Sequence, residues 1–165
     1  MTEWLKAGNT AVITGGASGI GLAAAQHYAA NGMNVVLADL DEDALQSAGA
    51  SISPAQGASV RTHVTDVTDS AQLDQLRDFA LGEFGSVACL MNNAGASLRQ
   101  GKPWEDLDKF KKQIDINYWG VVHGCHAFLP TMLASGQPSA VINTGSKQGI
   151  TNPPGDAAMI PAVFP

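Results

Sequence analysis

Short apolar runs alternate with longer segments of helical character, and this alternation restricts the fold more than any other feature of the sequence. Predicted strands cover residues 10–14, 34–38, 59–64, 87–91 and 140–144. Predicted helices cover residues 20–30, 41–48, 70–84 and 104–133. This order is typical of a parallel sheet with helices on both faces. We therefore predict an α/β fold with three layers and a doubly wound parallel sheet.

Several helix ends are marked by residues with known terminal preferences. Asn31-Gly32 and Gly85 are stop signals, because glycine readily adopts the left-handed conformation that ends many helices. Thr68 or Asp69 is a candidate N-cap for the helix that starts at residue 70. Residues 51–58 are small and rich in turn formers, which predicts a loop.

The first predicted strand runs directly into a glycine-rich loop, TGGASGIG, at residues 14–21. Gly15 would permit a tight turn, and Gly19 would let the backbone approach a pyrophosphate at the positive end of the following helix. Gly21 would let that helix pack close to the sheet. A plain turn between strand and helix is the alternative, but the position of the loop in a strand–helix–strand unit favours dinucleotide binding.

An acidic residue, Asp39, ends the second predicted strand. A carboxylate at this position can accept hydrogen bonds from both ribose hydroxyls of NAD, and it would repel the 2′-phosphate of NADP. No lysine or arginine lies between Gly8 and Arg61 to bind that phosphate. The sequence therefore favours NAD over NADP, while a solvated loop aspartate is the alternative.

Charge and composition exclude several other classes of protein. The formal net charge of −6 disfavours nucleic acid and anionic membranes as partners. No signal peptide and no membrane-spanning run are recognised. Cys89 and Cys125 lie in apolar segments, so we expect buried thiols in a reducing cytoplasm. His123 and His126 have no evident third ligand, so no metal site is predicted.

Several motifs, taken in order, resemble the short-chain dehydrogenase/reductase family. They are TGGASGIG at 14–21, Asp66-Val67, NNAG at 92–95, Asn117 within INYWG, and INTGSKQG at 142–149. The resemblance covers the chain to about residue 158, and it implies the strand order 3-2-1-4-5 for the first five strands. It also implies an oxidoreductase that moves a hydride between NAD and a small alcohol or ketone.

The resemblance assigns roles to particular residues. It implies contacts with the cofactor from Gly15, Ser18, Gly19, Ile20, Gly21, Asp39, Asp66, Val67, Asn93, Ala94 and Gly95. Asp66-Val67 would meet the adenine. Asn117 would support a water in the proton relay, and Ser146 would position the substrate oxygen. A tyrosine about 13 residues after this serine, with a lysine four residues beyond it, would supply the acid/base chemistry of the family.

That tyrosine and lysine pair is absent from this chain. Counting from Ser146 places Met159 and Val163 at the two positions, and the chain's tyrosines are Tyr28 and Tyr118. We therefore expect a Rossmann-type dinucleotide-binding domain over residues 1–158, incomplete at its C-terminal end, and a divergent tail over 159–165. We expect weak NAD binding, if any, and negligible dehydrogenase activity.

The same resemblance predicts an exposed surface. The fifth strand would be an apolar edge, and the helix around 117–129 would lack the helix that pairs with it in the family. Val121, Val122, Phe128 and Leu129 would then be partly bare. We expect a homo-oligomer formed through this helix.

Three functional readings stay open at this point. The first is an NAD-dependent oxidoreductase altered near residue 159. The second is an inactive nucleotide-binding or regulatory module that associates with an intact relative. The third is a product without function.

Overall fold

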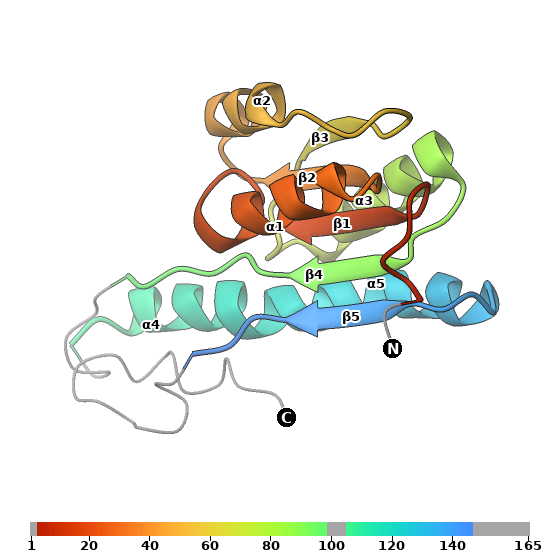
Figure 1. Ribbon diagram of the computed structural model, residues 1–165. Coiled ribbons are helices and arrows are strands. Elements are labelled where there is room, and N and C mark those ends of the chain that lie inside the picture. Colours follow the sequence, from red (N-terminus) through yellow and green to blue (C-terminus); the bar gives the residue numbers. More distant parts are fainter. Residues whose placement is uncertain (1–2, 99–104, 147–165) are drawn as a thin grey trace.

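The computed structural model describes residues 3–98 and 105–146, and these form a parallel sheet between two layers of helices (Figure 1). The strands are β1 Thr10–Thr14, β2 Asn34–Asp39, β3 Val60–Val64, β4 Cys89–Asn92 and β5 Ala140–Asn143. The helices are α1 Gly19–Ala30, α2 Glu42–Ser51, α3 Ser70–Phe84, α4 Leu107–Ile114 and α5 Gly120–Ala134, with a π-helical turn η1 at Asp115–Trp119.

The strand order is β3-β2-β1-β4-β5, and every neighbouring pair is parallel. The predicted fold class and strand order are therefore confirmed. β1 lies in the centre, where its whole length is buried. The chain moves outward from β1 to β3 and then returns to β4, so the strand order reverses beside β1. Ligands of open α/β sheets bind at such a reversal, outside the carboxyl ends of the strands.

Alternating side chains of the buried strands belong to two separate core clusters, one on each face of the sheet. Ala11 and Ile13 of β1 pack with residues of α1 and α2, whereas Val12 packs with residues of α3 and α5. Successive side chains of a strand point to opposite faces, so this division follows from the period of two. It establishes α1 and α2 as one covering layer and α3 and α5 as the other, as Figure 1 shows.

The predicted helix ends agree closely with the structure. Gly85 ends α3 in the left-handed conformation, with φ +77°, and its N–H donates to the Leu81 carbonyl. The Asp69 side chain caps α3 by accepting a hydrogen bond from the Ala71 N–H at 2.9 Å. α2 continues three residues past its predicted end at 48 and stops at Ser51, so the predicted loop begins one residue later. None of the described helices is long and apolar enough to cross a membrane.

The long helix predicted over 104–133 is divided by η1. α4, η1 and α5 follow one another without a gap, and a π turn contains one more residue than an α turn would. Trp104 lies outside the described residues. Such single π turns are frequent at functional sites, and the buried Asn117 lies inside this one.

His63 provides a test of the packing at β3. Burial lowers the pKa of this imidazole, which lies 5.0 Å from the Phe79 ring and forms a 2.9 Å hydrogen bond with Thr65. Because the unfolded chain then binds a proton more readily, acid should favour unfolding as the pH falls through the ordinary histidine pKa of about 6.5.

We expect His63→Gln to lose less stability than the wild type between pH 7.5 and pH 5.5. Urea unfolding at both pH values measures this loss. Since His27 is exposed on the opposite covering layer, His27→Gln is the matched control and should behave like the wild type. An equal pH dependence in all three proteins would contradict the prediction.

Candidate functional site

The carboxyl ends of β1 and β4 are joined by hydrogen bonds between their loops. The Thr14 hydroxyl oxygen accepts from the backbone N–H groups of Asn93 and Ala94, at 3.0 and 3.1 Å. The Asn93 side-chain amide donates to the carbonyl oxygens of Thr14 and Gly15, both at 3.1 Å. The glycine loop and the NNAG segment are therefore fixed to each other. Sequence reasoning gave Thr14 no role, although it begins the first motif.

The glycines of this loop are required by close contacts. A Cβ on Gly15 would lie 2.8 Å from Ala94 Cα, and φ there is +64°. A Cβ on Gly21 would overlap the Gly15 carbonyl oxygen and would lie 2.6 Å from Asn93 Nδ2. Gly19 has open space around it, but its φ of +55° still favours glycine. Gly15 and Gly21 therefore leave no room for a side chain, while the cofactor contacts predicted for them stay a prediction.

The start of α1 differs from the starts of α2, α3 and α4 in how it is capped. Asp41, Asp69 and Asp106 cap α2, α3 and α4 with their carboxylates. Among the described residues, the Ser18 side chain forms no such bond at α1, and no acidic residue occupies the first turn. The N–H groups at this end are consequently available to an anion, which the helix dipole also favours. Ile20 beside them is 69% exposed.

A cavity of about 300 Å³ adjoins this loop at the ends of β1, β2 and β3. Its lining includes the predicted residues Gly15, Asp39, Asp66, Val67, Ala94 and Gly95. Lys112, Asp115 and Ile116 close it from α4 and η1, and sequence reasoning missed them. The structure therefore brings the residues predicted for the adenosine half of a dinucleotide to one cavity.

Asp39 is held in place by two backbone donors. Its carboxylate accepts from the Ala17 N–H at 3.1 Å and from the Leu40 N–H at 2.8 Å. The first bond joins the end of β2 to the glycine loop. Asp66 is fixed similarly, because its Oδ1 accepts from both the N–H and the hydroxyl of Thr68, at 2.9 and 2.8 Å. Both carboxylates thus line the cavity in defined orientations.

α5 supports the other residue of the Asp66-Val67 pair. His123 Nδ1 lies 2.9 Å from the Val67 carbonyl oxygen, and a Cβ on Gly120 would lie 2.8 Å from Val67 Cγ2. His123 is therefore engaged with the backbone of the cavity wall. Within the described ranges, no three His, Cys, Asp or Glu side chains are grouped as metal ligands.

A second cavity of about 230 Å³ lies at the ends of β4 and β5. Ser146 and Asn117, the two predicted catalytic residues, both line it. Gly95 and Ala96 line this cavity and the first one, so the two cavities share a wall. Asn117 Oδ1 accepts from the Ala96 N–H at 2.8 Å, and its Nδ2 donates to the Ala96 carbonyl at 2.9 Å. The positions 159 and 163 lie outside the described residues.

Tyr28 is not suited to act as the tyrosine base that the family resemblance calls for. It lies in α1 within the core, and burial, followed by its interaction with Cys89, raises its pKa to about 12. A base working near neutrality needs a pKa lowered from 10. Burial likewise raises the pKa of the Cys89 thiol to about 12, which makes it a poor nucleophile.

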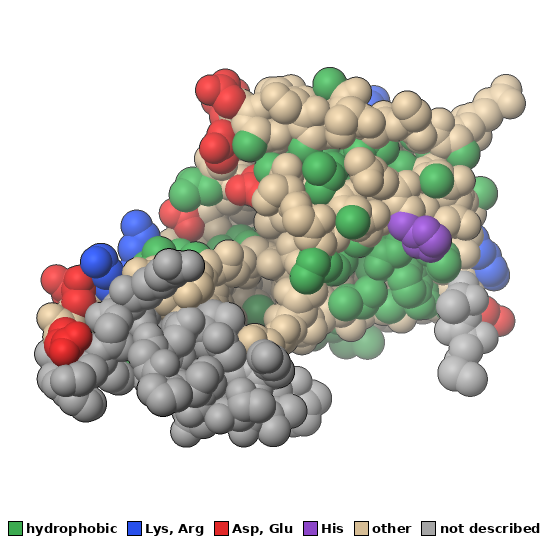
Figure 2. Space-filling view, turned by 60° about the vertical axis from the view of Figure 1, so that its left-hand side comes forward, with side chains coloured by type: hydrophobic (Ala, Val, Ile, Leu, Met, Phe, Trp, Pro, Cys, Tyr) green, Lys and Arg blue, Asp and Glu red, His purple; other side chains and the backbone are tan. Residues whose placement is uncertain are grey.

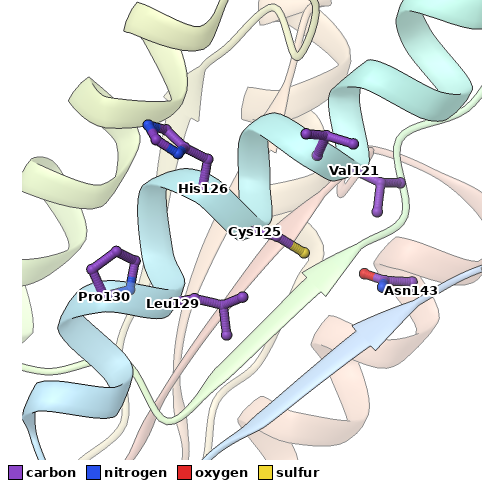
Figure 3. Close-up of a pocket in the computed structure, with 7 residues that line it drawn as sticks. Val121, Cys125, His126, Leu129, Pro130 and Asn143 are labelled. Carbon is purple, nitrogen blue, oxygen red and sulfur yellow. The ribbon is translucent and has the colours of Figure 1, made fainter.

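A third cavity, about 600 Å³ and larger than the other two, lies between α5 and β5 (Figure 3). In Figure 3, Val121, Cys125 and Leu129 project from α5 toward the side of Asn143 on β5. Figure 2 shows acidic side chains gathered at the upper left of that view.

The surface predicted for α5 is partly wrong. Phe128 is fully buried and Val121 is 8% exposed, while Val122 and Leu129 are half-buried. Phe128 packs in the core with residues of α3 and of the sheet. Consecutive helical residues point 100° apart, so only one member of each adjacent apolar pair faces the sheet.

Comparison with known proteins places this geometry in a family. The model of the short chain dehydrogenase family matches residues 9–158. A 1-deoxy-11-beta-hydroxypentalenate dehydrogenase of Streptomyces avermitilis is 41% identical over 140 residues, which are 84% of this chain and 52% of that protein. This chain thus spans about half the length of that relative.

Solved structures give the same result. A short chain dehydrogenase/reductase from Burkholderia phymatum, in complex with NAD, matches with a TM-score of 0.89 and 39% identity over 96% of this chain and 56% of the other. NAD⁺-bound xylitol dehydrogenase matches with a TM-score of 0.86 and 30% identity over 93% of this chain and 58% of the other. The chain therefore belongs to the short-chain dehydrogenase/reductase family of oxidoreductases.

Proposed function

We propose that this chain binds NAD across the two cavities and forms the coenzyme-binding part of an oxidoreductase that moves a hydride between NAD and an alcohol or carbonyl compound. The observation that carries the proposal is the cavity that Asp39, Asp66 and Val67 line together with Gly15 of the loop that leads to the uncapped start of α1. Solved relatives that hold NAD support it.

In this proposal the adenosine half of NAD lies in the cavity of about 300 Å³ that Asp39 and Asp66 line. Asp39 accepts hydrogen bonds from the ribose hydroxyls, and Asp66 and Val67 contact the adenine. The pyrophosphate lies over Gly15, Ser18, Gly19, Ile20 and Gly21 at the start of α1. The nicotinamide lies past Asn93, Ala94 and Gly95 toward Ser146. NAD supplies the hydride acceptor or donor, while Ser146 positions the substrate oxygen and Asn117 supports the proton relay.

The charge of Asp39 makes NAD the preferred coenzyme and gives a direct test. Asp39→Asn keeps an acceptor oxygen but removes the charge, so we expect about tenfold weaker binding of NADH, equal to ~1.4 kcal/mol. Binding of NADPH should not weaken, because the repulsion of its 2′-phosphate disappears. Fluorescence titration with both coenzymes measures the two dissociation constants.

Asp41→Asn is the matched control, because this exposed residue caps α2 and asparagine caps equally well. It should bind NADH as the wild type does. If Asp39→Asn leaves the ratio of NADPH to NADH affinity unchanged, or if the wild type binds neither coenzyme, the proposed site is wrong.

A second candidate function is a nucleotide-binding module without dehydrogenase activity. The observation that favours it is the presence of Met159 and Val163 at the positions of the family's tyrosine and lysine. We expect no NADH production from a panel of alcohols even when NADH binds. Turnover at a rate typical of the family would instead favour the oxidoreductase.

We also propose the assembly, boundary and location of the chain. A homo-oligomer formed through residues 117–129 would cover Val122 and Leu129, which line the apolar cavity of Figure 3.

Residues 1–158 form the dinucleotide-binding unit and 159–165 a separate tail, which the end of the family match at 158 supports. The free thiols of Cys89 and Cys125 support a cytoplasmic location.

A further inference from the structure

Two glutamine side chains hold opposite ends of the cleft through the same kind of hydrogen bond. Gln72 Oε1 accepts from the Asp66 N–H at 2.9 Å, beside the cavity of about 300 Å³ proposed for the adenosine half. Gln113 Oε1 accepts from the Leu98 N–H at 2.8 Å, directly after Ser97 in the wall of the smaller cavity. One glutamine therefore acts on the adenine end and the other on the end that contains Ser146.

Gln113 is completely buried, although its side chain is polar. It lies in α4 four residues before Asn117, so both side chains are on one face of the continuous helix. Together they accept from the N–H groups of Ala96 and Leu98, two residues apart along the chain. The two glutamine and asparagine acceptors thus bind N–H groups two residues apart, which is the spacing at which one strand of a sheet accepts from its neighbour.

The 96–98 segment is held by hydrogen bonds from these two side chains. Residues 93–98 belong to no helix or strand. Ser97 lines the cavity of Ser146, Ala96 lines both that cavity and the one at Asp39, and Gln113 lines neither of them. A buried amide without its partner is unfavourable, so loss of the Gln113 acceptor would leave the Leu98 N–H to find another partner by moving.

We propose that Gln113 is a positioning residue for the nicotinamide end of the cleft. It acts through Leu98, together with Asn117, by fixing the backbone of the 96–98 segment against which the nicotinamide and the substrate pack. This inference rests on the proposed function, because it takes the cleft to be a dinucleotide site. It adds that Gln113 acts through Leu98 and Ser97 on the end that contains Ser146, whereas Gln72 acts on the adenine end.

The test compares Gln113→Met with Gln72→Met, since methionine has nearly the same length but no comparable acceptor. Each protein is titrated with NADH and with ADP-ribose, which lacks only the nicotinamide. We expect Gln113→Met to weaken NADH binding by about tenfold and to change ADP-ribose binding by less than about twofold. Gln72→Met should weaken both ligands by the same factor, because it loosens only the adenine end.

The outcomes separate this inference from the proposed function. If the wild type binds neither ligand, the proposed function fails and the inference fails with it. If the wild type binds both ligands but Gln113→Met weakens them equally, or weakens neither, only the inference fails. A general loss of stability would weaken both ligands alike, so the selective loss of NADH identifies the positioning role.

A measurement on the wild type covers the case in which Gln113→Met does not fold. Hydrogen exchange of the Leu98 amide should be slow in the free protein, because this N–H is bonded to a buried acceptor. NADH should slow it further, whereas ADP-ribose should not. Exchange at the rate of an unfolded chain, or an equal effect of both ligands, would overturn the inference.

Discussion

Gly21→Ala is expected to weaken NADH binding by about tenfold to a hundredfold and to lower the free energy of unfolding by about 1–3 kcal/mol, the usual range for overpacking. The added Cβ would overlap the Gly15 carbonyl oxygen and would lie 2.6 Å from Asn93 Nδ2. Backbone atoms cannot rotate away as a long side chain can. The first turn of α1 must therefore shift from the sheet, and the hydrogen bonds between Asn93 and the glycine loop must lengthen.

The shift would damage the site, because the same loop presents the N–H groups proposed to bind the pyrophosphate. NADH titration and urea unfolding measure the two effects. Gly82→Ala is the matched control: Gly82 lies within α3 with open space where a Cβ would be. This control should gain about 0.5–1 kcal/mol in the free energy of unfolding. Wild-type affinity and stability in Gly21→Ala would contradict the prediction.

The fold could be predicted from the sequence because its signals are local. β1, β2 and β4 are buried on both faces, so their residues form short continuous apolar runs that a periodic helix does not produce. The stop at Gly85 and the cap at Asp69 follow from the conformational preferences of single residues. The strand order came from the resemblance to a family.

The candidate site was predictable only where a motif carried it. Gly15 and Gly21 belong to a known loop, and both make contacts that exclude a side chain. Lys112 lines the cavity and Gln113 binds Leu98 behind its wall, both from a helix that begins well beyond the NNAG motif, so no local pattern relates them to the cleft. A buried glutamine in an amphipathic helix gives a weak signal at best, because a polar residue is normally expected on the exposed face.

The turn η1 escaped prediction for a related reason. Its extra residue leaves no mark in the hydrophobic period, since Ile114, Ile116 and Asn117 fit an ordinary helix equally well. What stabilises it is tertiary: the Asn117 side chain forms two hydrogen bonds with Ala96. The sequence shows the asparagine, but the partner that makes the turn favourable comes from another part of the chain.

Phe128→Ala is expected to lower the free energy of unfolding by about 3–5 kcal/mol, the cost of removing a fully buried aromatic side chain and leaving a cavity. Phe128 is 0% exposed and packs in the cluster that joins α3 and α5 to the sheet. Domains of this size are stable by about 5–15 kcal/mol, so the change removes a large part of the total. Urea unfolding at constant pH measures the loss.

Leu133→Ala is the matched control, because Leu133 lies in the same helix and is 75% exposed. We expect its free energy of unfolding to stay within about 0.5 kcal/mol of the wild type. A loss below about 1 kcal/mol for Phe128→Ala would be too small for a buried aromatic residue. It would mean that Leu129 faces the sheet in place of Phe128, as the apolar pairs of the sequence also permit, and that α5 covers the sheet in a different rotation.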